Sequence, residues 1–151
     1  MRATPELRSD YVHFYPITTR WGDNDPYGHV NNVLYYSWFD TVVNQLLISR
    51  SVLDIAKGAV IGLVIETGCN YFSSVAFPDR ITAGLRVGQL GTSSIRYEIG
   101  IFRGDEQQTA AHGHLVHVCV DRLTRRPVAI PAPMRELLQT LLISTTAKPN
   151  S

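Results

Sequence analysis

One segment, residues 31–49, limits most strongly what this chain can fold into. A helical spacing gathers its polar side chains on one narrow stripe, which consists of Ser37, Asp40, Thr41, Asn44 and Gln45. The rest of the circumference is apolar or aromatic. A helix of this kind must be buried on most sides, so the remaining chain has to supply the elements that cover it.

The segments around this helix are predicted to be strands. They share β-branched or aromatic residues, or an alternation of apolar and polar side chains with a period of two. The predicted strands are 11–19, 59–72, 81–87, 94–101 and 109–120. Pro16 in the first of them indicates an edge or a bulge. A short helix is predicted over residues 135–142.

The order of these elements predicts an α+β fold of one domain. Short connections favour an antiparallel sheet, with the four later strands as a meander. The simplest packing curls this five-stranded sheet around the long central helix. The domain is expected over residues 11–143, between a flexible lead-in, 1–10, and a flexible tail, 144–151. Apolar helix and sheet surface then remains to be covered, which favours a homodimer.

Composition excludes several classes of protein. Of 151 residues, 44% are hydrophobic and 18% charged, which is typical of a globular protein and argues against disorder. A net charge of +1 argues against a nucleic-acid or polybasic membrane surface. No apolar run approaches the roughly 20 residues of a membrane span. The N-terminus lacks an apolar signal core, and Cys69 and Cys119 are interpreted as reduced thiols, so a cytoplasmic location is expected.

The loop before the helix concentrates the chemically capable residues. Residues 20–32 read Arg-Trp-Gly-Asp-Asn-Asp-Pro-Tyr-Gly-His-Val-Asn-Asn. Asp25 stands just before the helix start, where free N–H groups and the helix dipole favour an ionised carboxylate. The same N–H groups can bind a developing oxyanion, and Gly28 permits a close backbone approach. The alternative is that Asp25 only shapes the loop through an Asx-turn.

The other polar residues of this region have structural alternatives too. Asp23 is expected to bind Arg20. Asn31 or Asn32 is a natural helix cap, and the Asn32 side chain is also a candidate for holding a water molecule. His29 is expected to orient the acyl group, to hold a water molecule or to pair with Asp25, and the alternative is a structural role.

The element order and the loop together resemble the hotdog-fold acyl-CoA thioesterases, in the branch similar to 4-hydroxybenzoyl-CoA thioesterase. The pattern Asp-x-Asp-x-x-Gly-His-Val-Asn-Asn-x-x-Tyr carries the resemblance, and the element order extends it over residues 10–142. The resemblance implies that Asp25 is the nucleophile or general base. It also implies that an N–H group near residues 28–32 binds the thioester oxygen, and that dimers or tetramers hold the sites at subunit interfaces.

Candidate site residues follow from this resemblance. The catalytic candidates are Asp25, Gly28, His29 and Asn32. The substrate-binding candidates are Tyr35 and Trp38 for the acyl group, Ser93 and Ser94 for the pantetheine amides, and Arg125 and Arg126 for the phosphates of coenzyme A. The residues after Gly28 are more similar to the fatty or general acyl-CoA side of the family than to its aryl-CoA members.

Other chemistries have weaker support. His112, His114 and His117 form a His-x-His-x-x-His pattern, but His117 points to the opposite face of a strand, so no metal is expected. There is no Gly-x-Ser-x-Gly and no glycine-rich phosphate loop, and no cofactor is expected. The alternatives kept open are an acyl-carrier-protein thioesterase, a hydratase or dehydratase on the same scaffold, and a non-catalytic acyl-CoA-binding module.

Overall fold

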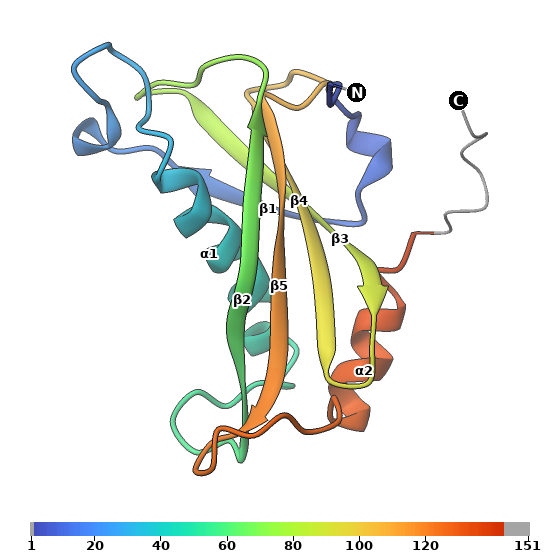
Figure 1. Ribbon diagram of the computed structural model, residues 1–151. Helices are drawn as coiled ribbons and strands as arrows, with labels where there is room; N and C mark the ends of the chain where they lie inside the picture. Colours follow the sequence, from blue (N-terminus) through green and yellow to red (C-terminus); the bar gives the residue numbers. More distant parts are fainter. Residues whose placement is uncertain (1, 144–151) are drawn as a thin grey trace.

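The computed structural model describes residues 2–143, and the predicted tail 144–151 lies outside them. In chain order the main elements are β1 His13–Thr18, α1 Leu34–Ser49, β2 Val60–Tyr71, β3 Arg80–Leu90, β4 Ser94–Arg103, β5 Ala111–Asp121 and α2 Ala132–Gln139 (Figure 1). Two short 3-10 turns, Arg8–Asp10 and Trp21–Asp23, flank β1. Within the described residues, no helix combines the length and the hydropathy that crossing a membrane requires.

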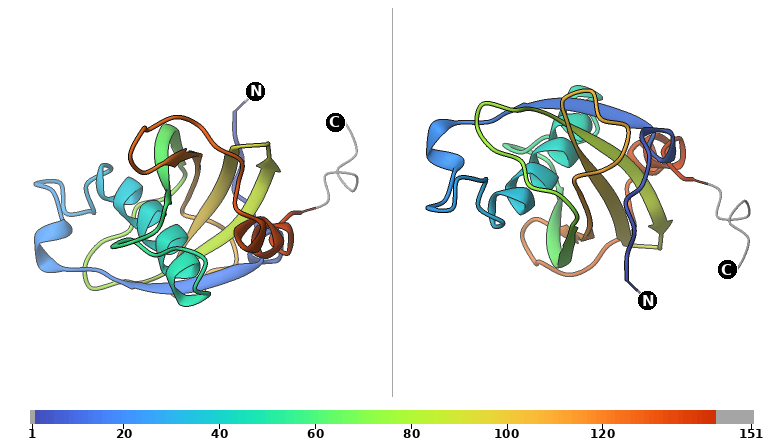
Figure 2. Two further views of the ribbon diagram at one scale, coloured as in Figure 1. Left: turned by 90° about the horizontal axis from the view of Figure 1, so that it is seen from below. Right: turned by 90° about the horizontal axis from the view of Figure 1, so that it is seen from above.

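The architecture is the predicted α+β hotdog fold. All five strands pair antiparallel in one sheet of order β1-β3-β4-β5-β2. The sheet curves around α1, which contacts β1, β2, β3 and β5 (Figure 2). The expectation that a mostly apolar helix forms the centre of the molecule is confirmed.

The burial of α1 depends on a recess in β5. Phe39 is fully buried, and its ring lies over Gly113. A Cβ atom on Gly113 would lie 2.7 Å from this ring and 2.1 Å from the carbonyl oxygen of Gly68 on β2. Only a glycine therefore lets the helix approach the sheet here. Burial of a phenylalanine side chain contributes about 1.5–3 kcal/mol, so this contact is one of the fixed points of α1.

The predicted meander is only partly correct. Strands β3, β4 and β5 do follow one another in the sheet, but β2 pairs with β5 at the far edge instead of with β3. The connection over residues 72–79 crosses the end of the sheet to reach β3 (Figure 1). Neighbouring strands are about 4.8 Å apart, so eight residues easily span the three spacings. The short connection between β2 and β3 is therefore compatible with two strands that are not neighbours in the sheet.

The segment before β1 makes contacts that the sequence did not predict. The Glu6 carbonyl accepts a hydrogen bond from Thr109 N–H, and the carboxylate of Glu6 pairs with Arg86 on β3. Arg86 also binds Glu98 on β4, and its side chain is only 11% exposed. Burial alone would raise the pKa of Glu98, but hydrogen bonds from Arg86 and Arg96 lower it. An ion-pair network thus fastens residues 6–10 to the outer face of the sheet.

The ends of the helices also differ from the prediction. The first helix begins at Leu34 instead of residue 31, and the last runs over Ala132–Gln139 instead of 135–142. The shift of α2 follows from Pro133, since proline is tolerated in the first turn of a helix, where its missing N–H would have no partner. Both cysteines are free, as expected.

Candidate active site

The loop between β1 and α1 meets the segment after β2 at one end of the molecule. Val30 N–H donates to the Val75 carbonyl at 2.8 Å, and Phe77 N–H donates to the Asn24 side chain at 3.0 Å. Between these two segments lies a cavity of about 480 Å³. From the first segment and α1 it is lined by Asp25, Tyr27, His29, Val30, Asn32 and Tyr35. The folding of the loop therefore places a carboxylate, an imidazole and a phenol in one cavity.

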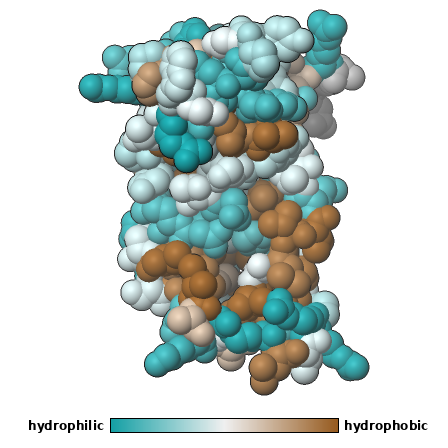
Figure 3. Space-filling view, turned by 90° about the vertical axis from the view of Figure 1, so that its left-hand side faces the viewer, coloured by the Kyte–Doolittle hydropathy of each residue, from teal (hydrophilic) through white to brown (hydrophobic). Residues whose placement is uncertain are grey.

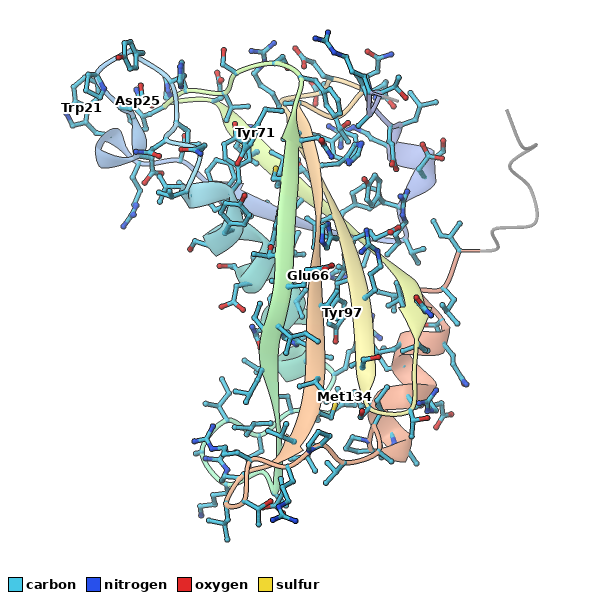
Figure 4. All side chains as sticks on the ribbon, viewed as in Figure 1. Trp21, Asp25, Glu66, Tyr71, Tyr97 and Met134 are labelled. Carbon is cyan, nitrogen blue, oxygen red and sulfur yellow. The ribbon has the colours of Figure 1, made fainter. Side chains whose placement is uncertain are left out.

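Asp25 holds its carboxylate in a fixed position in this cavity (Figure 4). Its side chain is only 15% exposed. Oδ1 accepts a hydrogen bond from Tyr27 N–H at 2.8 Å, which is the Asx-turn that the sequence offered as an alternative. Oδ2 lies 3.3 Å from His29 Nδ1. The turn and a chemical role are therefore compatible, because each uses a different oxygen.

Gly28 makes the tight return of the loop possible. Its φ is +83°, in the left-handed region that glycine adopts without strain. Gly28 N–H donates to the Asp25 carbonyl at 3.0 Å, and Asp25 N–H donates to the His29 carbonyl at 2.8 Å. These bonds bring His29 back beside Asp25. The imidazole of His29 is 46% exposed and stacks on Tyr27 at a centroid distance of 6.3 Å.

The N–H groups near the start of α1 differ in their availability. Those of Gly28, Val30 and Asn31 are already bonded to the carbonyls of Asp25, Val75 and Asp23. Asn31 Oδ1 accepts from Val33 N–H at 3.2 Å, which helps to delay the helix start to Leu34. Among the described residues, the N–H groups of His29 and Asn32 have no acceptor in the protein. These two are the donors left for a ligand oxygen.

One wall of the cavity was not predicted. It comes from the end of β2 and the residues that follow, namely Tyr71, Phe72, Ser73 and Ser74. The Tyr71 hydroxyl donates to the Asn32 carbonyl at 3.2 Å, and its ring meets that of Tyr35 edge-on at 5.0 Å. The only signal in the sequence was the aromatic pair before two serines at a strand end. Nothing local in that pattern places it opposite Asp25.

The predicted substrate-binding residues lie in different places. Tyr35 lines the cavity, and burial raises the pKa of its hydroxyl to about 12, so it is protonated at neutral pH. Trp38 is 6% exposed, packs against Tyr35 at 4.9 Å and does not line the cavity.

Ser93, Ser94, Arg125 and Arg126 lie far from Asp25 within one chain. Ser93 and Ser94 are at the turn between β3 and β4, and the two arginines follow β5. Tyr71, beside the cavity, pairs with Ala111 at the start of β5. The end of β5 at Asp121 is about 33 Å away, as ten residues of strand imply. One copy of the chain does not bring the two groups together.

Asp23 and the three histidines of β5, which were also singled out in the sequence, make structural contacts. Asp23 is buried and accepts hydrogen bonds from Arg20, as predicted. The histidines of the possible zinc pattern are divided between the faces of β5, with His112 and His114 outward and His117 inward. His114 lies 2.9 Å from Glu66, and His112 lies 3.6 Å from Glu6. Within residues 2–143, no three His, Cys, Asp or Glu side chains gather as metal ligands would.

A comparison with protein families identifies the class of this chain. The model described as the thioesterase-like superfamily matches residues 19–138, which is most of the sequence. The chain therefore belongs to the thioesterase-like superfamily, and it is a thioester hydrolase of the hotdog fold. The resemblance carried by residues 20–32 and by the element order is confirmed.

Solved structures agree with this assignment. The PA5185 protein from Pseudomonas aeruginosa is 54% identical, with a TM-score of 0.91 over 93% of this chain and 99% of that one. The PA2801 protein of the same organism, provisionally assigned as a thioesterase, is 30% identical, with a TM-score of 0.78 over 84% of this chain and 98% of that one. The BH1999 gentisyl-coenzyme A thioesterase, at 20% identity, shares the fold, with a TM-score of 0.74 over 83% of this chain and 99% of that one. Comparison with curated sequences gave no significant match.

Proposed function

We propose that the chain hydrolyses an acyl-CoA thioester to the free acid and coenzyme A, with Asp25 as the catalytic carboxylate. One observation carries the proposal. The carboxylate of Asp25 is held by Tyr27 N–H through one oxygen, while the other lies in a cavity beside the His29 imidazole. The N–H groups of His29 and Asn32, which have no acceptor within residues 2–143, belong to residues that line the same cavity.

The chemistry needs an oxygen nucleophile and donors for the oxyanion. In the general-base route, Asp25 Oδ2 takes a proton from water, whose oxygen bonds to the thioester carbon. The carbonyl oxygen becomes negative and binds the N–H groups of His29 and Asn32. The C–S bond then breaks, and the proton passes from Asp25 to the thiolate. In the covalent route Oδ2 itself attacks the thioester carbon, the C–S bond breaks and coenzyme A leaves as the thiolate. Water then cleaves the resulting anhydride, and of its two protons one ends on the thiolate and the other leaves with the product acid, which regenerates the Asp25 carboxylate.

A cysteine is a poor alternative nucleophile in this region. Cys69, on β2, is the nearer of the two in sequence to the cavity wall. Burial raises the pKa of its thiol to about 11, so it is protonated at neutral pH, and the thiolate is the nucleophilic form. Cys69 is also not among the residues that line the cavity.

The test is hydrolysis of a panel of acyl-CoA thioesters by the wild type and by Asp25→Asn. Asparagine keeps an oxygen for Tyr27 N–H, so the Asx-turn survives, but it supplies neither a base nor an anionic nucleophile. The expected result is a fall in kcat of at least about 100-fold with an unchanged melting temperature. Asp54→Asn is the matched control, because Asp54 Oδ1 accepts a hydrogen bond from Ala56 N–H in an exposed turn of the same kind and Asp54 does not line the cavity. Equal turnover by Asp25→Asn and wild type would exclude the role given to Asp25.

We also propose that two copies of the chain form the working enzyme through β2. This strand lies at the sheet edge and is twelve residues long, and its Leu63, Val64 and Ile65 are 36%, 49% and 62% exposed. A long apolar edge is a template for pairing with another strand. Figure 3, which looks onto the side of α1 and β2, shows apolar patches between polar side chains. The occupant that fits an edge of this kind is β2 of a second copy, antiparallel, in a two-fold dimer.

Such a dimer would also give a role to the predicted phosphate-binding residues, which lie far from Asp25 within one chain. An antiparallel β2 pair brings the Asp25 end of one copy beside the opposite sheet end of the partner. That end carries Arg125 and Arg126, which suit the phosphates of coenzyme A. Light scattering at assay concentrations should therefore give the mass of at least a dimer. A fully active monomer would contradict this proposal without affecting the assignment of Asp25.

The alternative functions have their own tests. A panel that includes acyl-carrier-protein thioesters identifies the carrier of the acyl group. Tight acyl-CoA binding without thiol release would indicate a binding module instead of an enzyme.

A further inference from the structure

A second cavity, of about 530 Å³, lies under the other half of α1. Its walls come from the helix, from β2 and from the inner faces of β4 and β5. Most of its lining is apolar and includes Leu47, Leu53, Ile61, Ile95 and Met134. This volume and lining are typical of a pocket that takes a small organic ligand or a carbon chain.

Two polar side chains inside this cavity are unusual. Tyr97 lies on β4 (Figure 4). It is fully buried, and its hydroxyl has no hydrogen-bond partner among the described residues. His117, on β5, is 5% exposed and makes no hydrogen bond within the same part of the chain. The two rings meet edge-on at 5.4 Å. Buried polar groups in proteins are nearly always paired, so a buried hydroxyl without a partner needs an explanation.

A glycine on the neighbouring strand makes room for the His117 ring. A Cβ atom on Gly62 of β2 would lie 2.9 Å from His117 Nδ1. Burial lowers the pKa of His117, although the Asp40 carboxylate opposes this effect, so the imidazole is neutral at pH 7. Burial likewise raises the pKa of Tyr97, which keeps its proton. The two buried polar side chains of the cavity, Tyr97 and His117, are therefore uncharged and offer one O–H donor and one imidazole.

The proposed dimer places this cavity beside the partner's active site. If β2 pairs with its copy over its whole length, Val60 faces Tyr71 of the partner subunit. Ile61 and Gly62 line the second cavity, and the partner subunit's Tyr71 lines the cavity that holds Asp25. A shift of the register by two residues moves the strands by only about 7 Å and keeps the two cavities adjacent.

We propose that this cavity receives the distal part of the acyl group bound at the partner's Asp25, and that the Tyr97 hydroxyl selects acyl groups carrying a neutral oxygen there. The inference rests on the proposed function and adds the substrate class, namely distally hydroxylated or oxo acyl-CoA thioesters. A hydroxyl or keto oxygen accepts a hydrogen bond from the Tyr97 hydroxyl, and a hydroxyl can also donate one to His117. Plain chains leave the Tyr97 hydroxyl unpartnered.

A charged distal group fits this cavity less well. A carboxylate would have to enter a mainly apolar space that offers it two neutral partners, with Asp40 also in the lining. The guanidinium of Arg122, which lines the cavity too, is already bonded to the carbonyls of Ile55 and Gly58. Dicarboxylic acyl groups are therefore expected to be poorer substrates than hydroxylated ones.

The experiment compares kcat/KM for matched thioesters, from hexanoyl- to dodecanoyl-CoA and their ω-hydroxy counterparts, with benzoyl- and 4-hydroxybenzoyl-CoA as an aromatic pair. The wild type should prefer at least one hydroxylated member over its parent by about tenfold, the value of one neutral hydrogen bond. Tyr97→Phe removes only the oxygen and should bring that ratio close to one. Tyr15→Phe, on β1, is the matched control and should keep the wild-type ratio.

The possible outcomes separate this inference from the proposed function. Hydrolysis of plain and hydroxylated thioesters at equal rates by the wild type would overturn the role of Tyr97 and leave the thioesterase activity standing. An unchanged preference in a folded Tyr97→Phe variant, judged by its melting temperature, would overturn it equally. Hydrolysis of none of these thioesters by the wild type would overturn both proposals.

Discussion

Replacement of Gly113 by alanine should destabilise the packing of α1 against the sheet. The added Cβ would stand 2.1 Å from the Gly68 carbonyl oxygen and 2.7 Å from the Phe39 ring. One neighbour is backbone in the β2–β5 ladder and the other is a fully buried core ring, so neither can move cheaply. Overpacking a core usually costs 1–3 kcal/mol. The expected loss for Gly113→Ala is at the upper end, about 3 kcal/mol, which lowers the melting temperature by about 6–12 °C.

Unfolding in urea, followed by tryptophan fluorescence, measures this loss. Trp38 is 6% exposed, next to the affected contact, whereas Trp21 is 79% exposed, so the spectral change reports mainly on the core. Protein concentration must be held constant, because dimer formation would make stability depend on it. Gly22→Ala is the control: nothing lies within 4 Å of its added Cβ, and the expected change is below about 0.5 kcal/mol. Equal stability of Gly113→Ala and wild type would refute the packing argument.

Two further predictions concern acid stability and assembly. Because burial lowers the pKa of His117 in the folded state, the unfolded chain binds a proton that the folded chain does not, and wild-type stability should fall as the pH drops below about 6.5. His117→Gln lacks this effect, so its free energy of unfolding in urea should decline less steeply between pH 7 and pH 5 than that of the wild type. Parallel stability curves for the two proteins would contradict the lowered pKa of His117. Ile65→Lys places a charge on the exposed edge strand β2. Light scattering should then give the mass of a monomer, and the activity assay should show reduced thioester hydrolysis. A variant that remains an active dimer would exclude pairing through this edge.

The sequence predicted what depends on local periodicity. The polar residues of the first helix follow one narrow stripe, and the alternation in residues 94–101 follows the two faces of a strand, so both elements were predicted with small errors at their ends. The start of α1 was placed too early, because Asn31 bonds to Val33 N–H and keeps the chain in a turn. That competition between side chain and backbone is decided by geometry that a sequence pattern does not contain.

The features that the sequence did not predict depend on contacts between distant residues. The pairing of β2 with β5 joins Tyr71 to Ala111, and no signal in either strand specifies this partner. For the same reason, the wall formed by residues 71–74 was missed, although the opposite wall at Asp25 was found. Residues 125 and 126 were recognised by their chemistry, but their distance from Asp25 within one chain became evident only from the strand register.

The position of β2 at the sheet edge has a genetic consequence. If each site combines Asp25 of one chain with the Tyr97 cavity of its partner, two defective alleles can restore each other. A chain carrying Asp25→Asn and a chain carrying Tyr97→Phe, paired in one molecule, form one site with both lesions and one site with none. With random pairing, half of the molecules are mixed, so about a quarter of all sites regain wild-type selectivity. Intragenic complementation of this kind would reveal an interface crossing the site without any structure of the complex.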